Sequence, residues 1–227
     1  MPLILNIDTA TETATVAISE ENRVVSSFTN SNQKDHASFL QPAIKKILKE
    51  AGLNIKDLNA VAVTSGPGSY TGLRVGMASA KGLCYALNIP LITINTLEVM
   101  ALSAIFKIDD KESLYCPMID ARRTEVYTAI YTYDLKEIIK PCALILSKET
   151  LKSFIENSKI YFLGNGSLKL RSYQQHDNAL FIDIEISSGA IVKLSYKNYK
   201  EKNFADVTYA SPLYIKEFYT IASKTSS

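Results

Sequence analysis

The sequence of 227 residues predicts an α/β protein of two lobes, each a mixed β-sheet with helices packed against it. The first observation is the order of elements over residues 3–108: three strands, a helix, a strand, a helix, a strand and a helix. Hairpins followed by βαβ crossovers give a mixed five-stranded sheet. The second observation is that three strands leading into a helix recur from residue 114, after the polar segment 109–113. Two halves with the same opening order indicate a duplicated architecture.

Three strands joined by hairpins open the chain. Residues 3–7 are apolar, residues 13–19 alternate between apolar and polar side chains, and residues 23–29 are rich in Val, Ser and Thr, with polar turns between these segments. Asp8 and Thr9 form a polar pair where the first strand passes into its turn. Hydrogen bonding within the turn is the simplest role for both residues.

A helix is expected over residues 35–51, with Asp35 as its N-cap and Pro42 bending it. His36 lies in the first turn, and the residue four positions later is Leu40. A two-histidine metal site on this helix is therefore not available. The predicted apolar face consists of Phe39, Leu40, Ala43, Ile44, Ile47, Leu48 and Ala51, with lysines opposite.

The most distinctive stretch is a buried strand over residues 58–65, a turn at Gly66-Pro67-Gly68, and a helix from about 70 to 87 with Ser69 as N-cap. Small residues recur every fourth position of this helix, and two interior glycines weaken an isolated helix by about 2 kcal/mol. The stripe must therefore permit a close backbone approach, either to the chain's own sheet or to another helix, and the stripe alone leaves both open. Its members are Gly72, Gly76, Ala80 and Cys84.

A glycine-rich turn before a helix also suits an anion, because the first amides of the helix point outward. The spacing from Gly66 to Gly72 is G-x-G-x-x-x-G, one residue away from the dinucleotide fingerprint, and the Lys-Ser/Thr ending of a P-loop is absent. A phosphate site built on Gly66, Gly68 and Ser69 is therefore the minority interpretation.

Composition narrows the functional classes. A formal charge of +2, from 25 basic and 23 acidic side chains, gives no electrostatic sign of binding to nucleic acid or membrane. Three widely spaced cysteines fit neither a disulfide framework nor a zinc site. The amino terminus lacks the basic region of a signal peptide, and no apolar run is long enough to cross a bilayer. We expect a cytoplasmic protein without membrane contact.

The lobe boundaries are expected at residues 1–108 and 109–227, with the second lobe reduced. The last segment, about 207–222, is a candidate to return to the first lobe. In the second half, strands are expected over 114–119, 125–133, 137–146 and 160–163 and a helix over 147–157, and the segments 168–173, 181–184 and 189–202 continue the pattern.

The strand, Asp-Thr turn, strand, strand order, repeated in the second half, resembles the actin-like ATPase (RNase H-like) fold of sugar kinases and heat-shock chaperones. Within that fold, the strings GPGSYTGLRVGMASAKGL, DARRTEVY, IDTATETATVAI and SPLYIKEF resemble the TsaB family, also called YeaZ, which belongs to bacterial threonylcarbamoyladenosine synthesis on tRNA. The resemblance runs from Leu3 to about Phe218. It is most specific between Gly66 and Gly76.

The resemblance implies a non-catalytic partner of a TsaD-type subunit, which acts with a TsaE-type ATPase. That subunit transfers a threonylcarbamoyl group to the adenosine next to the anticodon of ANN-decoding tRNAs. It binds its metal through His-x-x-x-His on the corresponding first helix, whereas this chain has only His36, with Leu40 at the second position. The resemblance therefore implies no catalytic residue and no metal in this chain, contact with tRNA only through the complex, and a homodimer as an option for the chain alone.

The resemblance also implies where the partner binds. In TsaB-like proteins the first two helices pack as a bundle against their counterparts in TsaD or in a second TsaB copy. The interface residues expected on this basis are Phe39, Leu40, Ala43, Ile47, Gly72, Val75, Gly76 and Ala80.

The alternative function is a self-sufficient actin-fold ATPase or phosphotransferase, and a metalloprotease is less favoured because no HExxH motif is present. Phosphoryl transfer needs a carboxylate for Mg²⁺ and glycine-rich loops for phosphates. We expect no cofactor of the chain's own, with ATP or ADP at the complex interface as the alternative. The candidate nucleotide or cleft residues are Asp8, Thr9, Gly66, Gly68, Ser69, Asp120 and Arg122.

Overall fold

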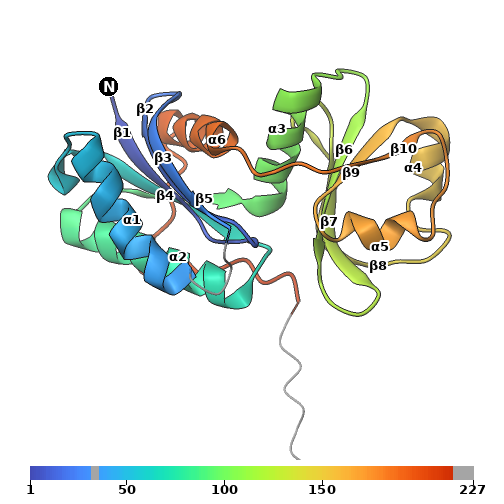
Figure 1. Cartoon of the computed structure of the whole chain (residues 1–227), viewed down its shortest axis with the longest axis horizontal. Coiled ribbons are helices and arrows are strands. Elements are labelled where there is room, and N and C mark those ends of the chain that lie inside the picture. The colour runs from blue at the N-terminus through green and yellow to red at the C-terminus, as the bar shows by residue number, and fades with distance from the viewer. Residues whose placement is uncertain (32–35, 217–227) are drawn as a thin grey trace, which may run out of the picture.

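The computed structural model describes residues 1–31 and 36–216, so the predicted N-cap Asp35 and the end of the chain after residue 216 lie outside the described residues. Two lobes stand side by side (Figure 1). The sheet of the first lobe has the order β3-β2-β1-β4-β5. Its strands are β1 (Leu3–Asp8), β2 (Ala14–Glu20), β3 (Arg23–Asn30), β4 (Ala60–Gly66) and β5 (Leu91–Asn95), and a short 3-10 helix, η2 (Ile55–Asp57), precedes β4.

Helices cover both faces of this first sheet (Figure 1). α1 (His36–Glu50) and α2 (Tyr70–Leu87) pack on the face formed by Leu5, Val61 and their neighbours. α3 (Thr96–Ile108) and α6 (Ser188–Lys200) pack on the opposite face. Because side chains of a strand alternate between faces, each strand contributes to both cores.

The second sheet repeats the first, with the order β10-β9-β6-β7-β8. In each lobe the first three strands are antiparallel neighbours, and the fourth and fifth run parallel to the first. The predicted two-lobed α/β architecture is confirmed. The elements are β6 (Leu114–Asp120), β7 (Glu125–Tyr131), β8 (Glu137–Ile145), α4 (Lys152–Asn157), β9 (Ile160–Leu163), α5 (Ser167–Arg171) and β10 (Ala179–Ile182).

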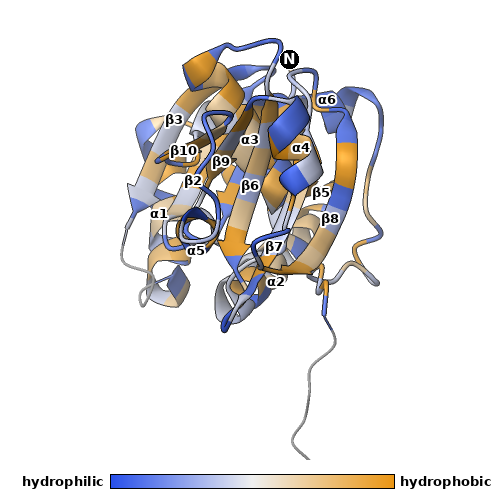
Figure 2. Cartoon of the chain, turned by 90° about the vertical axis from the view of Figure 1, so that its right-hand side faces the viewer, coloured by the Kyte–Doolittle hydropathy of each residue, from blue (hydrophilic) through white to orange (hydrophobic). Residues whose placement is uncertain are grey.

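The second lobe keeps five strands, and its own helices are short, with six residues in α4 and five in α5. Figure 2 looks onto this lobe and shows hydrophobic and hydrophilic stretches following one another along the edge strand β8. Within residues 1–31 and 36–216, no helix is long and apolar enough to span a membrane.

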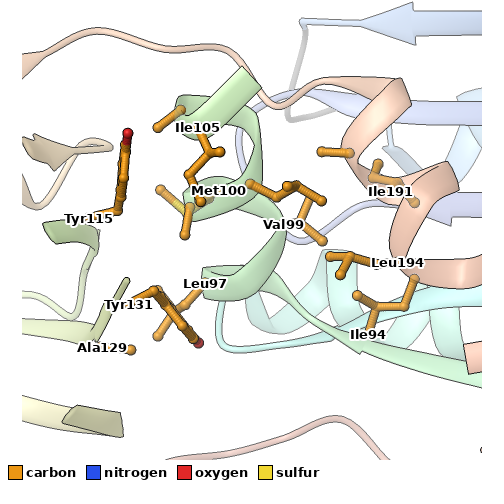
Figure 3. Packing of buried hydrophobic residues seen from close by; sticks show 14 of the residues in the cluster. Ile94, Leu97, Val99, Met100, Ile105, Tyr115, Ala129, Tyr131, Ile191 and Leu194 are labelled. Atoms are coloured by element: carbon orange, nitrogen blue, oxygen red, sulfur yellow. The ribbon is translucent and has the colours of Figure 1, made fainter. Parts of the chain in front are cut away.

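α3 joins the two lobes by apolar packing on nearly all of its sides (Figure 3). Leu97 and Met100 of α3 lie in one cluster with Tyr115 and Tyr131 of the second sheet. On the other side, α3 contacts α6 and the first sheet, and this part of the cluster includes Ile191. A helix that is apolar all round is stable only where it is covered all round, which is the position of α3 between the sheets.

The chain returns to the first lobe earlier than the segment 207–222 that the sequence singled out. α6 already packs on β1, β2, β3 and β5. The chain then runs along the first lobe over residues 203–216, called here the carboxy-terminal strap. Its Ala205 N–H donates to the carbonyl of Leu91 at 2.8 Å, and its Leu213 N–H donates to the carbonyl of Ser65 at 2.7 Å.

The glycines of α2 face the chain's own sheet. A Cβ atom on Gly72 would lie 2.0 Å from the carbonyl oxygen of Thr9, and one on Gly76 would lie 2.4 Å from Thr9 Oγ1. Thr9 Oγ1 donates to the carbonyl of Gly72 at 2.7 Å, and Ala80 is fully buried in the same core. The expectation that Gly72, Gly76 and Ala80 form a subunit interface is wrong, because β1 already occupies the space beside them.

Three of the residues expected at the interface on α1 are also internal. Leu40, Ala43 and Ile47 are buried between α1 and the first sheet. They form the inner side of the predicted apolar face, which covers the chain's own sheet. Only Phe39, and Val75 on α2, remain partly exposed among the eight expected interface residues.

Gly76→Ala is expected to lower the free energy of unfolding by about 1–3 kcal/mol, because its Cβ would overlap Thr9 Oγ1. Gly82 is the matched control on the same helix, since a Cβ there meets no atom within 4 Å. Gly82→Ala should raise the free energy of unfolding by about 0.5–1 kcal/mol through helix propensity. Urea denaturation measures both variants. Equal effects at the two positions would contradict the packing described here.

Candidate functional site

A cleft of about 1360 Å³ lies between the lobes. The first lobe contributes the β1–β2 turn and the start of α2. The second lobe contributes the β6–β7 hairpin, the β9–α5 turn and the segment after β10. The last four described residues, Leu213–Lys216, also line the cleft.

The structure brings four of the seven predicted cleft residues to the cleft wall. Gly68 and Ser69 line it from the first lobe, and Asp120 and Arg122 line it from the second. The other three, Asp8, Thr9 and Gly66, are buried behind the wall.

The glycine-rich turn is filled by the chain itself. A Cβ on Gly68 would lie 2.1 Å from the carbonyl oxygen of Ala10, and the Ser69 N–H donates to that same carbonyl at 2.7 Å. Gly66 has a φ of 120°, and a Cβ there would lie 2.8 Å from the carbonyl oxygen of Leu213. The glycines thus permit close approach of the β1–β2 turn and the strap. They do not form an open cradle for a phosphate.

Ser69 acts as the predicted N-cap of α2, with its Oγ accepting from the Gly72 N–H at 3.3 Å. The amide and the side chain of Ser69 are therefore both used within the chain.

Asp8 is built into the fold at the end of β1, with 1% of its surface exposed. Its Oδ1 accepts hydrogen bonds from Thr64 Oγ1 at 2.6 Å and from the Ala10 N–H at 3.0 Å. Burial raises the pKa of Asp8 above its ordinary value, although these two hydrogen bonds and nearby His36 act in the opposite direction. Asp8 therefore does not present its carboxylate to the cleft, and the carboxylate that lines this wall is that of Glu12.

His36 begins α1 and is also buried, with Nε2 2.9 Å from the carbonyl oxygen of Thr11. The Oδ2 of Asp8 and the Nδ1 of His36 are buried and have no hydrogen-bond partner. Within residues 1–31 and 36–216, no three His, Cys, Asp or Glu side chains gather in a way that could hold a metal ion.

The β6–β7 hairpin carries the charged groups of the second lobe. Asp120 Oδ1 accepts from Lys169 Nζ at 2.5 Å and from the Arg122 N–H at 2.6 Å. Burial acts to raise the pKa of Asp120, but these hydrogen bonds outweigh it and hold the pKa below its ordinary value. Arg122 and Arg123 form the turn with φ values of 69° and 51°, a left-handed conformation that costs a non-glycine residue about 1–2 kcal/mol.

Two polar side-chain contacts between described residues cross the cleft. Asn165 Nδ2 donates to Glu12 Oε1 at 3.4 Å, and Lys216 of the strap pairs with Glu125 of β7. The sequence singled out Asn165 only as part of Gly164-Asn165-Gly166, the second-lobe loop of the alternative phosphotransferase, and it did not assign Glu12 or Lys216 to the site. No local pattern marks Glu12 or Lys216, because each is defined by a partner on the other lobe.

The three cysteines do not provide a nucleophile at neutral pH. Burial raises the pKa of Cys84 to about 11 and that of Cys116 to about 12, and it also raises the pKa of Cys142. Only a thiolate attacks efficiently, so burial disfavours the reactive form of each of these thiols.

Comparison with known proteins gives the family. Residues 23–207 match the family model described as "TsaD: tRNA N6-adenosine threonylcarbamoyltransferase". The TsaB protein of Bacillus subtilis (strain 168) is 33% identical over 165 residues, which are 71% of this chain and 70% of that protein. The TsaB protein of Haemophilus influenzae is 27% identical over 228 residues, covering 94% and 93% of the two chains. Both relatives are named tRNA threonylcarbamoyladenosine biosynthesis protein TsaB.

Solved structures show the same fold. YeaZ from Pseudomonas aeruginosa superimposes with a TM-score of 0.82 at 24% identity, covering 94% of this chain and all (100%) of that one. A putative N-acetylmannosamine kinase from Listeria monocytogenes superimposes with a TM-score of 0.52 at 10% identity, covering 88% of this chain and 100% of that one. The predicted actin-like fold is confirmed.

Asp8→Asn and Asp120→Asn are expected to change the pH dependence of stability in opposite senses. The folded-state pKa of Asp8 is raised, so the wild type should lose stability relative to Asp8→Asn as the pH rises from about 4 toward neutrality. The folded-state pKa of Asp120 is lowered, so its contribution should be present above about pH 4 and disappear as the pH falls below it. Solvent screening makes the Asp120 effect the smaller one.

Urea denaturation of the three proteins between about pH 2.5 and 7 measures these slopes, with the unfolded aspartate (pKa about 3.9) as the reference. Slopes of the same sign for both variants would contradict the opposite environments of the two carboxylates.

Proposed function

This chain belongs to the TsaB family of tRNA threonylcarbamoyladenosine biosynthesis, and on that premise we propose that it is a non-catalytic subunit. It binds a TsaD-type threonylcarbamoyltransferase and supports that enzyme in forming threonylcarbamoyladenosine next to the anticodon of ANN-decoding tRNAs. A TsaE-type ATPase joins the same complex, and tRNA is contacted through the complex. The chain alone is able to pair with a second copy through the same surface.

The observation that carries the non-catalytic role is the filled turn of the first lobe. Ala10 and Leu213 approach the glycines where an actin-like ATPase needs space for phosphates. Asp8, the carboxylate at that position, is buried under hydrogen bonds from Thr64 and Ala10. The chain therefore has no cofactor of its own in this proposal, and ATP or ADP at the complex interface remains the alternative.

The partner surface we propose is the outer side of α2, called here the outer face. It lies opposite the buried glycine stripe and has no charged side chain along its length. A Cβ on Gly82 would meet open space. Small side chains allow a second helix to approach closely, the Tyr85 ring beside them is 86% exposed, and Arg74 and Lys81 border the strip. The outer face consists of Thr71, Val75, Ala78, Gly82 and Ala86.

α1 extends this surface on one side. Gln41 Nε2 donates to Ser79 Oγ at 3.1 Å and ties the outer sides of the two helices together. Phe39 is partly exposed and Pro42 is exposed, so α1 adds apolar area. Of the interface residues predicted from the sequence, the proposed surface keeps only Phe39 and Val75. The others are buried, and residues on the outer side of α2 take their place.

Gly82→Leu tests the partner surface. Leucine should fit without strain in the free chain, and the higher helix propensity should keep the unfolding midpoint at or above that of the wild type. In a complex the side chain should overpack the helix contact and weaken binding to a cognate TsaD-type protein by about tenfold or more. Isothermal titration calorimetry of the purified proteins measures the affinity.

Ser153→Leu is the matched control, because it adds the same side chain to an exposed position on α4 of the second lobe. It should leave the affinity unchanged. Wild-type affinity in Gly82→Leu would show that the outer face of α2 is not the partner surface.

The alternative, a self-sufficient actin-fold ATPase or phosphotransferase, is favoured only by the presence of the cleft, whose volume of about 1360 Å³ exceeds the roughly 300–1,000 Å³ typical of small-molecule sites. The isolated chain should not turn over ATP. Turnover that Asp120→Ala abolishes would replace the proposed function by this alternative.

Arg122→Ala is expected to lower the activity of the reconstituted complex by less than about 10²-fold, the loss typical for removing a general acid or base. Arg122 is exposed, and its backbone N–H donates a hydrogen bond to Asp120 Oδ1, so a role in shaping the cleft wall suffices. Threonylcarbamoyl transfer to tRNA, measured with the complex intact, gives the value. Complete loss would make Arg122 a catalytic residue.

A further inference from the structure

The carboxy-terminal strap is firmly held on the first lobe over most of its length. Ala205 extends the edge of the first sheet by an antiparallel bridge to Leu91. Lys81 of α2 donates from Nζ to the carbonyl oxygens of Thr208 at 3.1 Å and Ala210 at 2.8 Å. Together with the bond from the Leu213 N–H to Ser65, these contacts fix the strap from the sheet edge to the end of β4.

The position of the strap is part of the fold, as Gly66 demonstrates. A side chain at Gly66 would collide with the carbonyl oxygen of Leu213, and the φ of 120° is one that side-chain-bearing residues rarely adopt. The strand end that carries the glycine-rich turn is thus shaped to receive the strap.

The end of the strap leaves the first lobe and reaches the second. Tyr214 OH accepts from Arg74 Nε at 3.0 Å, and the Tyr214 ring lies 5.7 Å from that of Tyr70. Two residues later, Lys216 pairs with Glu125 at the start of β7. The side chains of Lys216 and Glu125 are 41% and 23% exposed, so the pair stands in water at the cleft.

The two sides of the molecule are therefore joined in different ways. At α3 the lobes share a buried apolar cluster, which opens only at the cost of exposing that cluster to water (Figure 3). Across the cleft, the polar contacts between side chains of the described residues are the Lys216–Glu125 pair and the long bond from Asn165 to Glu12. An exposed ion pair contributes little to stability and breaks without unfolding either lobe.

We propose that the carboxy-terminal strap is a latch between the lobes. Residues 205–213 anchor it to the first lobe, and Lys216 holds the second lobe through Glu125, so that the pair sets how far the cleft opens about α3. A charged ligand or protein surface that competes for Lys216 or Glu125 would release the latch and widen the cleft. The latch does not depend on the identity of the partner subunit, because all of its contacts lie within the chain.

Charge reversal on the full chain tests the latch. Lys216→Glu and Glu125→Lys should each place like charges at the contact and open the cleft. Small-angle X-ray scattering of either single variant should then give a larger radius of gyration than the wild type, because opening of the cleft moves the lobes apart. The double variant Lys216→Glu/Glu125→Lys restores the pair with exchanged signs and should return the radius of gyration to the wild-type value.

Lys152→Glu is the control, since it reverses one member of another exposed pair, Lys152–Glu149, away from the cleft. It should leave the radius of gyration unchanged. Hydrogen–deuterium exchange of the β4 and β9 amides serves as the reference for global unfolding and should not change in any variant.

Three outcomes would overturn the latch. The first is a wild-type radius of gyration in both single variants. The second is a double variant as expanded as the single ones, which would mean that the two side chains act separately. The third is faster exchange throughout β9, which would show a general loss of stability in the second lobe and no movement between the lobes.

Discussion

The close approach of α2 to the end of β1 is the constraint on which the first lobe depends. Gly68, Gly72 and Gly76 each leave space that the backbone or side chain of Thr9 and Ala10 fills. With any side chain at these positions, α2 could not lie this near the sheet. This packing also bears on the proposed function. The Gly66-Pro67-Gly68 turn, where an actin-like ATPase needs space for phosphates, is occupied by Ala10 and Leu213 of the same chain. The same packing leaves the opposite side of α2 free for a partner.

The two lobes are related as copies, yet they are connected asymmetrically. α3 is covered by both sheets and by α6, so the apolar cluster of Figure 3 acts as a hinge that holds the lobes together. Across the cleft the contacts are polar and few. A TsaB-type protein with a filled nucleotide turn still keeps a cleft of about 1360 Å³, and its opening depends on a weak contact that other charges are able to replace. Opening and closing of the cleft is thus compatible with the non-catalytic role proposed for this chain.

Much of the fold followed from local patterns in the sequence. Hairpin strands, the helical periods of α1 and α2, the cap at Ser69 and the repeated order of elements are encoded over neighbouring residues, and the structure has all of them. The resemblance of its motifs placed the chain in its family. Four of the seven predicted cleft residues line the cleft between the lobes. The predictions that were wrong concern which side of a helix is buried and what covers it. The four-residue period of Gly72 and Gly76 established that something approaches closely, and it could not say whether that neighbour was another subunit or Thr9.

The sequence by itself determined the elements, their order, the duplicated architecture and the family, because periodicity, capping residues and turn chemistry act between residues close in the chain. Tertiary structure alone decided which side of α2 is buried, that Leu40 belongs to the core, that α6 returns to the first sheet, and that Lys216 meets Glu125 across 91 positions of sequence. The physical reason is that a packed face has the same local pattern whatever covers it. Its neighbour is fixed only when distant segments compete for the same apolar surface.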